Sequence, residues 1–208
     1  MSKSSATLGL RLVLPAALAL AAGCYTAGPA TTVQRIDPKA QVDLSGYWND
    51  SDANQIAEVM MRDCLSRPWA AQFTARERRE PVVKLYPIRN RSSEHMDTKF
   101  FTKQVEEELV NSGVVKVVAA SDETQDARNE RAEQAEHASD ETKKEQQQET
   151  GTDFLLNGWV VSQIDRAGGQ SVRAYAVTME LINAETQEKV WLKLHQIKKI
   201  VDQAQYQW

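Results

Sequence analysis

The residues best suited to chemistry are two serines, a glutamate and a histidine in succession: Ser92, Ser93, Glu94 and His95. Such side chains can build a hydrolytic site or bind a metal ion. A serine nucleophile, however, needs a shaped turn of the G-x-S-x-G type, and neither serine lies in one. Adjacent Glu94 and His95 do not make a metal site, because metal ligands converge from separate elements. We therefore predict no catalytic residue, no metal site and no cofactor, and we expect that the chain is not an enzyme.

The same stretch has the composition of a loop that contacts another protein. Two arginines flank an asparagine directly after an apolar run that ends at Pro87. Arginine is favoured in protein interfaces because its planar head carries several hydrogen-bond donors. We predict a partner-binding surface that consists of Arg89, Asn90, Arg91, Glu94 and His95, with Trp159 and Tyr175 as aromatic anchors.

Three alternatives stay open for this surface. Asn90 and the two serines could serve only to satisfy backbone groups at the strand end. Glu94 could pair with one of the two neighbouring arginines. Core packing would explain Trp159 and Tyr175 as well as partner contact does.

A strand–helix–strand unit is predicted to position the loop. Residues 81–87 form a short strand, and Asp97 caps a helix whose apolar stripe is Phe101, Val105 and Leu109. Residues 114–120 form the next strand. A crossover of this length predicts a parallel pair of strands packed against the helix.

A second helix is predicted before this unit. Asn49, Asp50 or Ser51 can cap it, and apolar side chains recur at helical spacing from Ala53 to Cys64. Residues 66–80 indicate a connection anchored by two aromatic side chains, Trp69 and Phe73.

The last third of the chain predicts three strands joined by short turns. In the middle strand, alternation places Tyr175, Val177, Met179 and Leu181 on one face. In the last strand it places Val190, Leu192 and Leu194 together and His195 on a solvated face. The fold class is therefore α/β (α+β): a mixed sheet with helices packed on it, in which a β–α–β unit precedes an antiparallel meander.

Residues 121–149 differ in kind, because they carry ten acidic and four basic side chains and no large apolar one. Such a segment cannot bury a face of its own. It is either a solvated helix or a disordered insertion in the domain.

The first 23 residues indicate a signal peptide. Lys3 and Arg11 precede or border an apolar stretch that is shorter than the roughly 20 residues a spanning helix needs. The ending "LAAGC" resembles a bacterial lipobox, so we predict lipidation of Cys24; an ordinary signal peptide ending at a cysteine is the alternative. Tyr25 rather than aspartate follows, which by the same resemblance favours the outer membrane.

The remaining chain divides into two parts by composition. Residues 24–43 are predicted to be the lipidated N-terminus and a flexible tether, and residues 44–208 a single domain. Loss of residues 1–23 would change the net charge from −4 to −6, because Lys3 and Arg11 leave with no carboxylate. This charge argues against nucleic acid as a partner.

Several phrases together resemble the LpoB family of penicillin-binding-protein activators. They are "DLSGYWNDSDANQIAEVMMRDCL", "PIRNRSSEHMDTKFFTKQVEEELVNSGVVKVV", "GTDFLLNG" and "ELINAETQEKVW". The phrase "GTDFLLNG" and the unit before it also resemble the N-terminal domain of TolB. The resemblance implies a lipoprotein at the periplasmic face of the outer membrane that has no small-molecule substrate. It would bind a class A penicillin-binding protein, a bifunctional peptidoglycan synthase, and activate it.

A second function class remains. The chain could be a structural envelope lipoprotein with a TolB-like domain, acting in an envelope assembly or secretion complex. Stimulation of a purified synthase distinguishes the two.

Overall fold

The computed structural model describes residues 32–38, 40–145 and 147–202. The chain divides into two units, residues 1–36 and 37–208, and the fold below is that of the second unit. No helix among the described residues is long and apolar enough to cross a membrane.

The first helix, α1 (Asp50–Ser66), begins as its sequence predicts. The Asn49 side chain accepts a hydrogen bond from the Asp52 amide, and the Asp52 carboxylate accepts one from the Asn49 amide, each at 3.0 Å. This reciprocal pair satisfies two backbone donors that a helix start leaves open. The apolar side chains from Ala53 to Cys64 are buried along one stripe.

The predicted connection over residues 66–80 contains a second helix, α2 (Trp69–Glu77), so that prediction was wrong in part. The helix starts directly after Pro68, whose fixed φ suits a helix start. Trp69 and Phe73 are the anchors expected. Their rings pack edge-on against Phe154, with centroids 5.0 and 5.4 Å from it.

The β–α–β unit is present. Strand β1 (Val82–Leu85) is followed by the two-residue strand β2 (Arg89–Asn90), helix α3 (Thr98–Asn111) and strand β3 (Lys116–Val118). Asp97 caps α3 by accepting from the Lys99 amide at 2.9 Å. Strands β1 and β3 run parallel, as the length of the crossover predicts.

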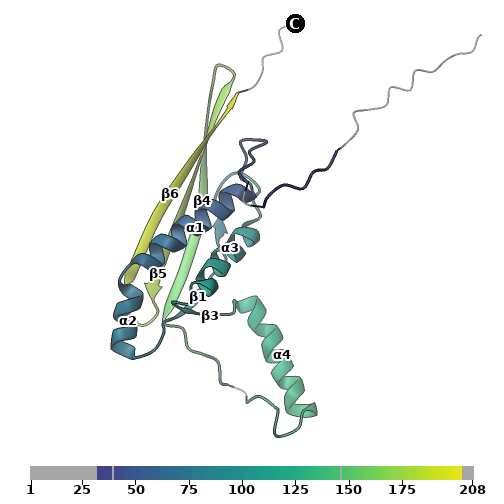
Figure 1. The fold of residues 1–208 in the computed structure, drawn as a ribbon, viewed down its shortest axis with the longest axis vertical. Coiled ribbons are helices and arrows are strands. Elements are labelled where there is room, and N and C mark those ends of the chain that lie inside the picture. Colours follow the sequence, from purple (N-terminus) through teal and green to yellow (C-terminus); the bar gives the residue numbers. More distant parts are fainter. Residues whose placement is uncertain (1–31, 39, 146, 203–208) are drawn as a thin grey trace, which may run out of the picture. The chain divides into compact units, whose positions relative to one another are not determined.

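The meander is also confirmed. It consists of β4 (Phe154–Ala167), β5 (Gln170–Asn183) and β6 (Lys189–Asp202), each antiparallel to the next. The sheet has the order β3–β1–β4–β5–β6 (Figure 1). Strand β1 is parallel to β4, and β2 pairs with β4 further along. The sheet is mixed, as the fold class requires.

The hydrophobic core lies between one face of this sheet and helices α1, α2 and α3. Alternate side chains of β4 and β5 point into it, among them Leu156, Val160, Tyr175 and Met179. The opposite face of the meander carries side chains that are polar or at least partly exposed. Burial of the first set is the main stabilising contribution of the fold.

The last strand departs from the prediction. Leu192 and Leu194 are 56% and 53% exposed, whereas Val190 packs against the core and Trp191 is buried. The register shifts between Leu181 and Ile182, where β6 contributes an extra residue. Because side chains alternate with period two, one extra residue exchanges the faces of the strand.

The predicted face of His195 was wrong for the same reason. His195 lies on the helix-covered face of β6, together with Trp191. Its side chain is half-buried rather than on a solvated face. Burial and the nearby Lys193 charge lower the pKa of the His195 imidazole.

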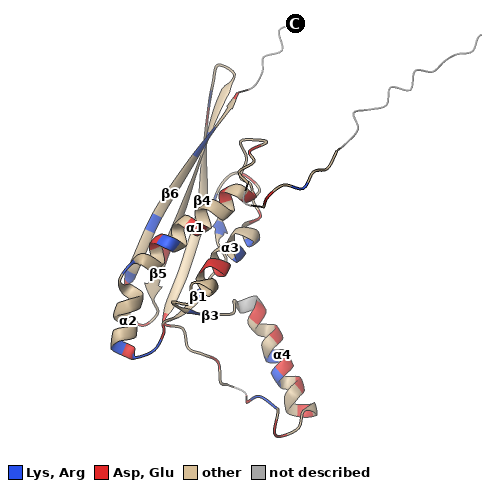
Figure 2. Cartoon of the chain, viewed as in Figure 1, with Lys and Arg blue, Asp and Glu red and all other residues tan. Residues whose placement is uncertain are grey.

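The charged segment forms a helix over part of its length, α4 (Ser121–His137), which is the helical alternative of the prediction. The described side chains of α4 include no buried residue, and both signs of charge are spread along it (Figure 2). Ion pairs at the surface link α4 to the rest of the chain, among them those from Lys103 to Glu123 and from Arg128 and Arg131 to Glu149. Such pairs contribute little to stability.

Replacing residues 121–149 with a Gly/Ser linker of about 12 residues, enough for a parallel crossover, is expected to change the free energy of unfolding by less than about 1 kcal/mol. The reason is that α4 adds no apolar side chain to the core. Urea denaturation of the full chain and the deletion variant measures the difference. A loss of several kcal/mol would show that α4 belongs to the folded core.

Candidate functional site

The predicted contact residues from Arg89 to His95 lie in residues 89–97, here called the contact loop, which is held against the middle of the sheet. Strand β2 pairs in parallel with β4, so that Arg89 lies opposite Trp159 and Asn90 opposite Val160. The Arg91 amide continues the ladder by donating to the Val160 carbonyl at 2.8 Å. The backbone that carries the two arginines is therefore fixed by the sheet.

Arg91 and Trp159 form the most distinctive pair of this surface. The guanidinium carbon of Arg91 lies 4.8 Å from the centroid of the Trp159 ring. Arg91 is exposed and Trp159 is half-buried. A cation over an aromatic face is attracted by the ring quadrupole, by about 0.5–1 kcal/mol at an exposed site. The contact thus holds a charged, solvent-facing head in one orientation.

Asn90 and Ser92 shape the loop from within. The Asn90 side chain donates to the Glu94 carbonyl at 2.7 Å and accepts from the Ser92 amide at 2.9 Å. The Ser92 hydroxyl donates to Asn90 Oδ1 at 2.7 Å and accepts from the Glu94 amide at 3.2 Å. The backbone-satisfying role is confirmed for both residues, since their polar atoms are used by the loop itself.

Glu94 points inward and pairs with neither loop arginine. Its carboxylate lies 2.5 Å from the Arg173 guanidinium and accepts from the Tyr175 hydroxyl at 2.7 Å. The side chains of Glu94 and Arg173 are 8% and 11% exposed. The suggested pairing with Arg89 or Arg91 was wrong, because the partner comes from β5, far along the chain.

Tyr175 is fully buried, and its ring packs edge-on against Trp48 with centroids 5.7 Å apart. Its hydroxyl also lies 3.0 Å from the Gly46 carbonyl. Burial, followed by the hydrogen bond to Glu94, raises the pKa of the Tyr175 phenol. The structure therefore places Tyr175 in the core, and it offers no exposed surface to a partner.

The two ends of the loop are anchored by apolar side chains. Ile88 and Met96 are buried, and the Ile88 amide donates to the Thr102 hydroxyl of α3 at 3.1 Å. His95, between them, is exposed. The side chains of Arg89, Arg91 and His95 are therefore exposed, with Arg89 and Arg91 beside Trp159 and with Asn90 and Glu94 as internal supports.

Arg173 and Tyr47 belong to this region, although the sequence marked neither. The Arg173 guanidinium carbon lies 3.9 Å from the centroid of the Tyr47 ring. Arg173 sits in a strand of alternating side chains, where a long-range partner leaves no local pattern. Tyr47 and Trp48 form an aromatic pair before α1 that could have indicated packing.

The loop side chains that the sequence marked as candidates for chemistry include two that are engaged in contacts within the domain. The hydroxyl of Ser92 is engaged in the loop, and Glu94 is engaged with Arg173 and Tyr175. In the described part of the chain, no three His, Cys, Asp or Glu side chains lie together in a way that could hold a metal ion.

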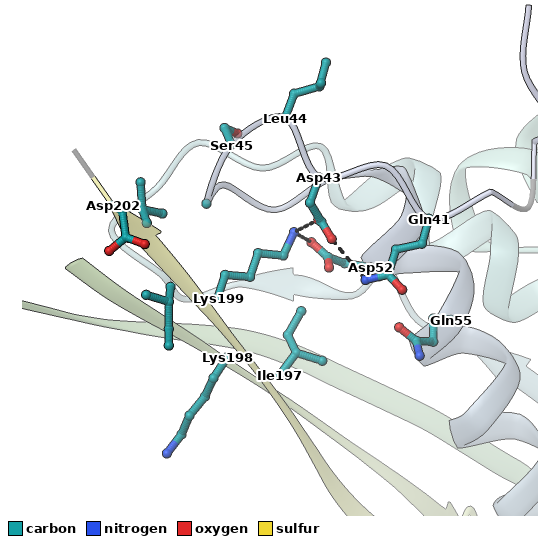
Figure 3. Close-up of a pocket in the computed structure, with 13 residues that line it drawn as sticks. Gln41, Asp43, Leu44, Ser45, Asp52, Gln55, Ile197, Lys198, Lys199 and Asp202 are labelled. Carbon is teal, nitrogen blue, oxygen red and sulfur yellow. Dashed lines mark hydrogen bonds and ion pairs between the residues drawn. The ribbon is translucent and has the colours of Figure 1, made fainter. Parts of the chain in front are cut away.

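A second polar cluster lies where the chain enters α1. The Lys199 ammonium of β6 lies 2.7 Å from Asp43 and 2.7 Å from Asp52, beside an open hollow of about 570 Å³ (Figure 3). Burial opposes the charge of Lys199, but its hydrogen bonds to Asp43 and Asp52 raise its pKa overall. Burial raises the pKa of Asp52. Asp43, at the end of the predicted tether, is thus fastened to the domain.

The pKa of Asp43 is lowered to about 2, chiefly by the hydrogen bond from Lys199 and then by those from Gln41 and Asn49. A folded pKa below the ordinary 3.8 means that Asp43 contributes stability above about pH 4 and loses it as the pH falls toward 2. We expect the stability difference between wild type and Asp43→Asn to be largest above pH 4 and to shrink below it. Urea denaturation at a series of pH values measures it, and a difference independent of pH would contradict the assignment.

Cys24, the predicted lipidation site, lies outside the described residues.

Comparison with known proteins decides the family. The sequence model described as peptidoglycan-synthase activator LpoB matches residues 52–197, which is most of the chain. The chain belongs to the LpoB family. The match includes the whole contact loop and Trp159. LpoB proteins are described as activators of peptidoglycan synthases.

Solved structures similar to this LpoB relative share little sequence with it. The LpoB C-terminal domain from Escherichia coli is 15% identical, with 70% of this chain and 98% of that chain covered and a TM-score of 0.45. The NMR structure of E. coli LpoB is 13% identical, with coverage of 92% and 94% and a TM-score of 0.38. Lipoprotein GNA1162 from Neisseria meningitidis is 14% identical, with coverage of 61% and 88% and a TM-score of 0.40. No curated protein sequence matches the chain significantly.

Proposed function

We propose that this protein is lipidated at Cys24, is held at the periplasmic face of the outer membrane, and binds and activates a bifunctional class A penicillin-binding protein. Membership of a family of peptidoglycan-synthase activators is the observation that carries the proposal. The "LAAGC" sequence supports the lipid anchor. Acyl chains supply membrane affinity through buried methylene groups.

The partner surface is formed by Arg89, Arg91, His95 and Trp159. The two arginines and His95 are exposed, and the half-buried Trp159 ring lies under the Arg91 head. Interfaces favour arginine and tryptophan at their energetic centres. Because β2 fixes the backbone of both arginines and the Trp159 ring holds the Arg91 head, less conformational entropy is lost on binding.

Asn90, Glu94 and Tyr175 support this surface from within. Asn90 bonds the loop backbone, while Glu94 and Tyr175 tie the loop to β5. Their contribution to binding is to keep the exposed residues in place.

Activation follows from preferential binding. A protein that shifts its partner toward an active state must bind that state more tightly than the inactive one. The activator then needs no catalytic group of its own. Its effect is set by the difference between the two affinities.

Glycan-strand synthesis by a purified class A penicillin-binding protein, measured with and without the full chain, tests the proposal. We expect faster synthesis and a saturable dependence on the concentration of the chain. Absence of both binding and stimulation would overturn the proposal and favour a structural role in the envelope.

A further inference from the structure

The segment that leads into α1 lies against the sheet as a strap, defined here as residues 42–48. Lys199 of β6 holds it at two points: its ammonium lies 2.7 Å from the Asp43 carboxylate (Figure 3) and 3.1 Å from the Tyr47 carbonyl. Asn49 adds a hydrogen bond to the Val42 carbonyl at 3.1 Å. Leu44, by contrast, is 95% exposed and points away from the sheet. The strap is therefore docked through a few named contacts.

Gly46 marks the closest approach of the strap to the sheet. A β-carbon at this position would lie 2.3 Å from Val201 Cγ2 and 2.9 Å from Arg173 Cδ. Both distances are shorter than carbon atoms tolerate, so a larger residue would push the strap and these side chains apart. Glycine lets the strap backbone reach the side chains of β5.

The strap and the contact loop use the same two side chains of β5. The Tyr175 hydroxyl lies 3.0 Å from the Gly46 carbonyl of the strap and 2.7 Å from the Glu94 carboxylate of the loop. The Arg173 guanidinium binds Glu94 at 2.5 Å and stacks on the Tyr47 ring of the strap at 3.9 Å. Segments that are distant in sequence thus meet in one polar cluster.

We propose that docking of the strap and binding of the partner are coupled through Arg173 and Tyr175. The docked Tyr47 ring covers Arg173 and keeps water from its ion pair with Glu94. An ion pair that is shielded from water is stronger than an exposed one. Release of the strap would weaken the hold on Glu94.

Weaker binding of the Glu94 side chain would also affect the exposed residues of the loop, because Glu94 is connected to them by two hydrogen bonds. The Glu94 carbonyl accepts from the Asn90 side chain, and Asn90 in turn holds Ser92. Asn90 lies between the two arginines of the surface. The loop therefore keeps its binding-competent form best when the strap is docked, and a partner that selects this form favours docking in return.

The expected effect on partner affinity rests on the proposed function, whereas the coupling of the strap to the contact loop does not. The first two residues of the strap, Val42 and Asp43, are also the last two of the predicted tether to Cys24. A pull on the tether would act first on the strap, and the cluster would pass its effect to the loop.

Hydrogen–deuterium exchange of the full chain in detergent micelles tests the coupling without a partner. Tyr47→Ala removes the ring over Arg173, and Leu44→Ala is the matched control in the same strap. We expect the amides of residues 91–94 to exchange about fivefold faster or more in Tyr47→Ala and unchanged in Leu44→Ala. Faster exchange in the strap with unchanged exchange in the loop would overturn the coupling.

A second experiment measures the affinity of the same variants for a purified class A penicillin-binding protein. Tyr47→Ala is expected to bind about fivefold more weakly or worse, and Leu44→Ala as wild type does. A loosened loop with unaltered affinity would refute the link to the partner. If wild type itself does not bind, the proposed function fails, and the exchange experiment still decides the coupling.

Discussion

Replacing Arg173 with alanine is expected to lower the free energy of unfolding by about 3 kcal/mol, at the lower end of the range for a broken buried ion pair. The substitution leaves the Glu94 carboxylate, which is 8% exposed, without the cation 2.5 Å away. It also removes the guanidinium that stacks on Tyr47. An unpaired, poorly hydrated charge is the main cost. Urea denaturation followed by circular dichroism measures the change.

A double variant distinguishes the loss of the Arg173–Glu94 ion pair from the cost of leaving the buried Glu94 charge unpaired. Arg173→Met combined with Glu94→Gln removes both charges and keeps similar volume, so its destabilisation should be smaller than that of Arg173→Ala. Arg62→Ala is a suitable control, because Arg62 pairs with Glu58 at an exposed position and should cost little. Equal effects of Arg173→Ala and Arg62→Ala would show that the buried pair does not stabilise the domain.

The largest functional effect is expected from Arg91→Glu, which should reduce stimulation of the synthase by tenfold or more, a change of about 1.4 kcal/mol or more in binding. Arginine offers only donors, so the partner must present acceptors to it, and a carboxylate would meet them with repulsion. Stability should change by about 1 kcal/mol or less, since the side chain is exposed and loses one cation–π contact. Glycan synthesis and thermal unfolding of the same preparation measure both.

The matched control for this charge reversal is Arg166→Glu. Arg166 is exposed on the same strand as Trp159, near the turn to β5. The substitution Arg166→Glu changes the net charge by the same amount as Arg91→Glu, but Arg166 lies outside the proposed surface. Similar loss of stimulation in both variants would point to long-range electrostatics rather than contact at Arg91. A large loss of stability in Arg91→Glu would instead make Arg91 part of the scaffold.

Local signals predicted the elements that frame the site. The capping residues Asn49 and Asp97, and the stripe of Phe101, Val105 and Leu109, appear in the structure as expected. Such features depend on contacts three or four residues apart, which the order of residues states directly. The meander could be predicted for a similar reason, because its turns join neighbouring strands.

The faces of β6 could not be predicted from alternation alone. The extra residue at Val190 exchanges them, so that Trp191 enters the core while Leu192 and Leu194 remain exposed. Helix α2 was missed because a nine-residue helix after a proline carries too short a pattern. Helix α2 depends on packing of Trp69 and Phe73 against Phe154, which lies far along the chain.

The sequence by itself determined the family, the α/β class and the position of the contact loop, because these follow from local patterns and from long shared phrases. Only the tertiary structure decided which loop residues face solvent. It turned Glu94 inward, buried Tyr175 and set Arg91 on Trp159. The physical reason is that these orientations depend on partners in β4 and β5, which the chain brings beside the loop only when the sheet has formed.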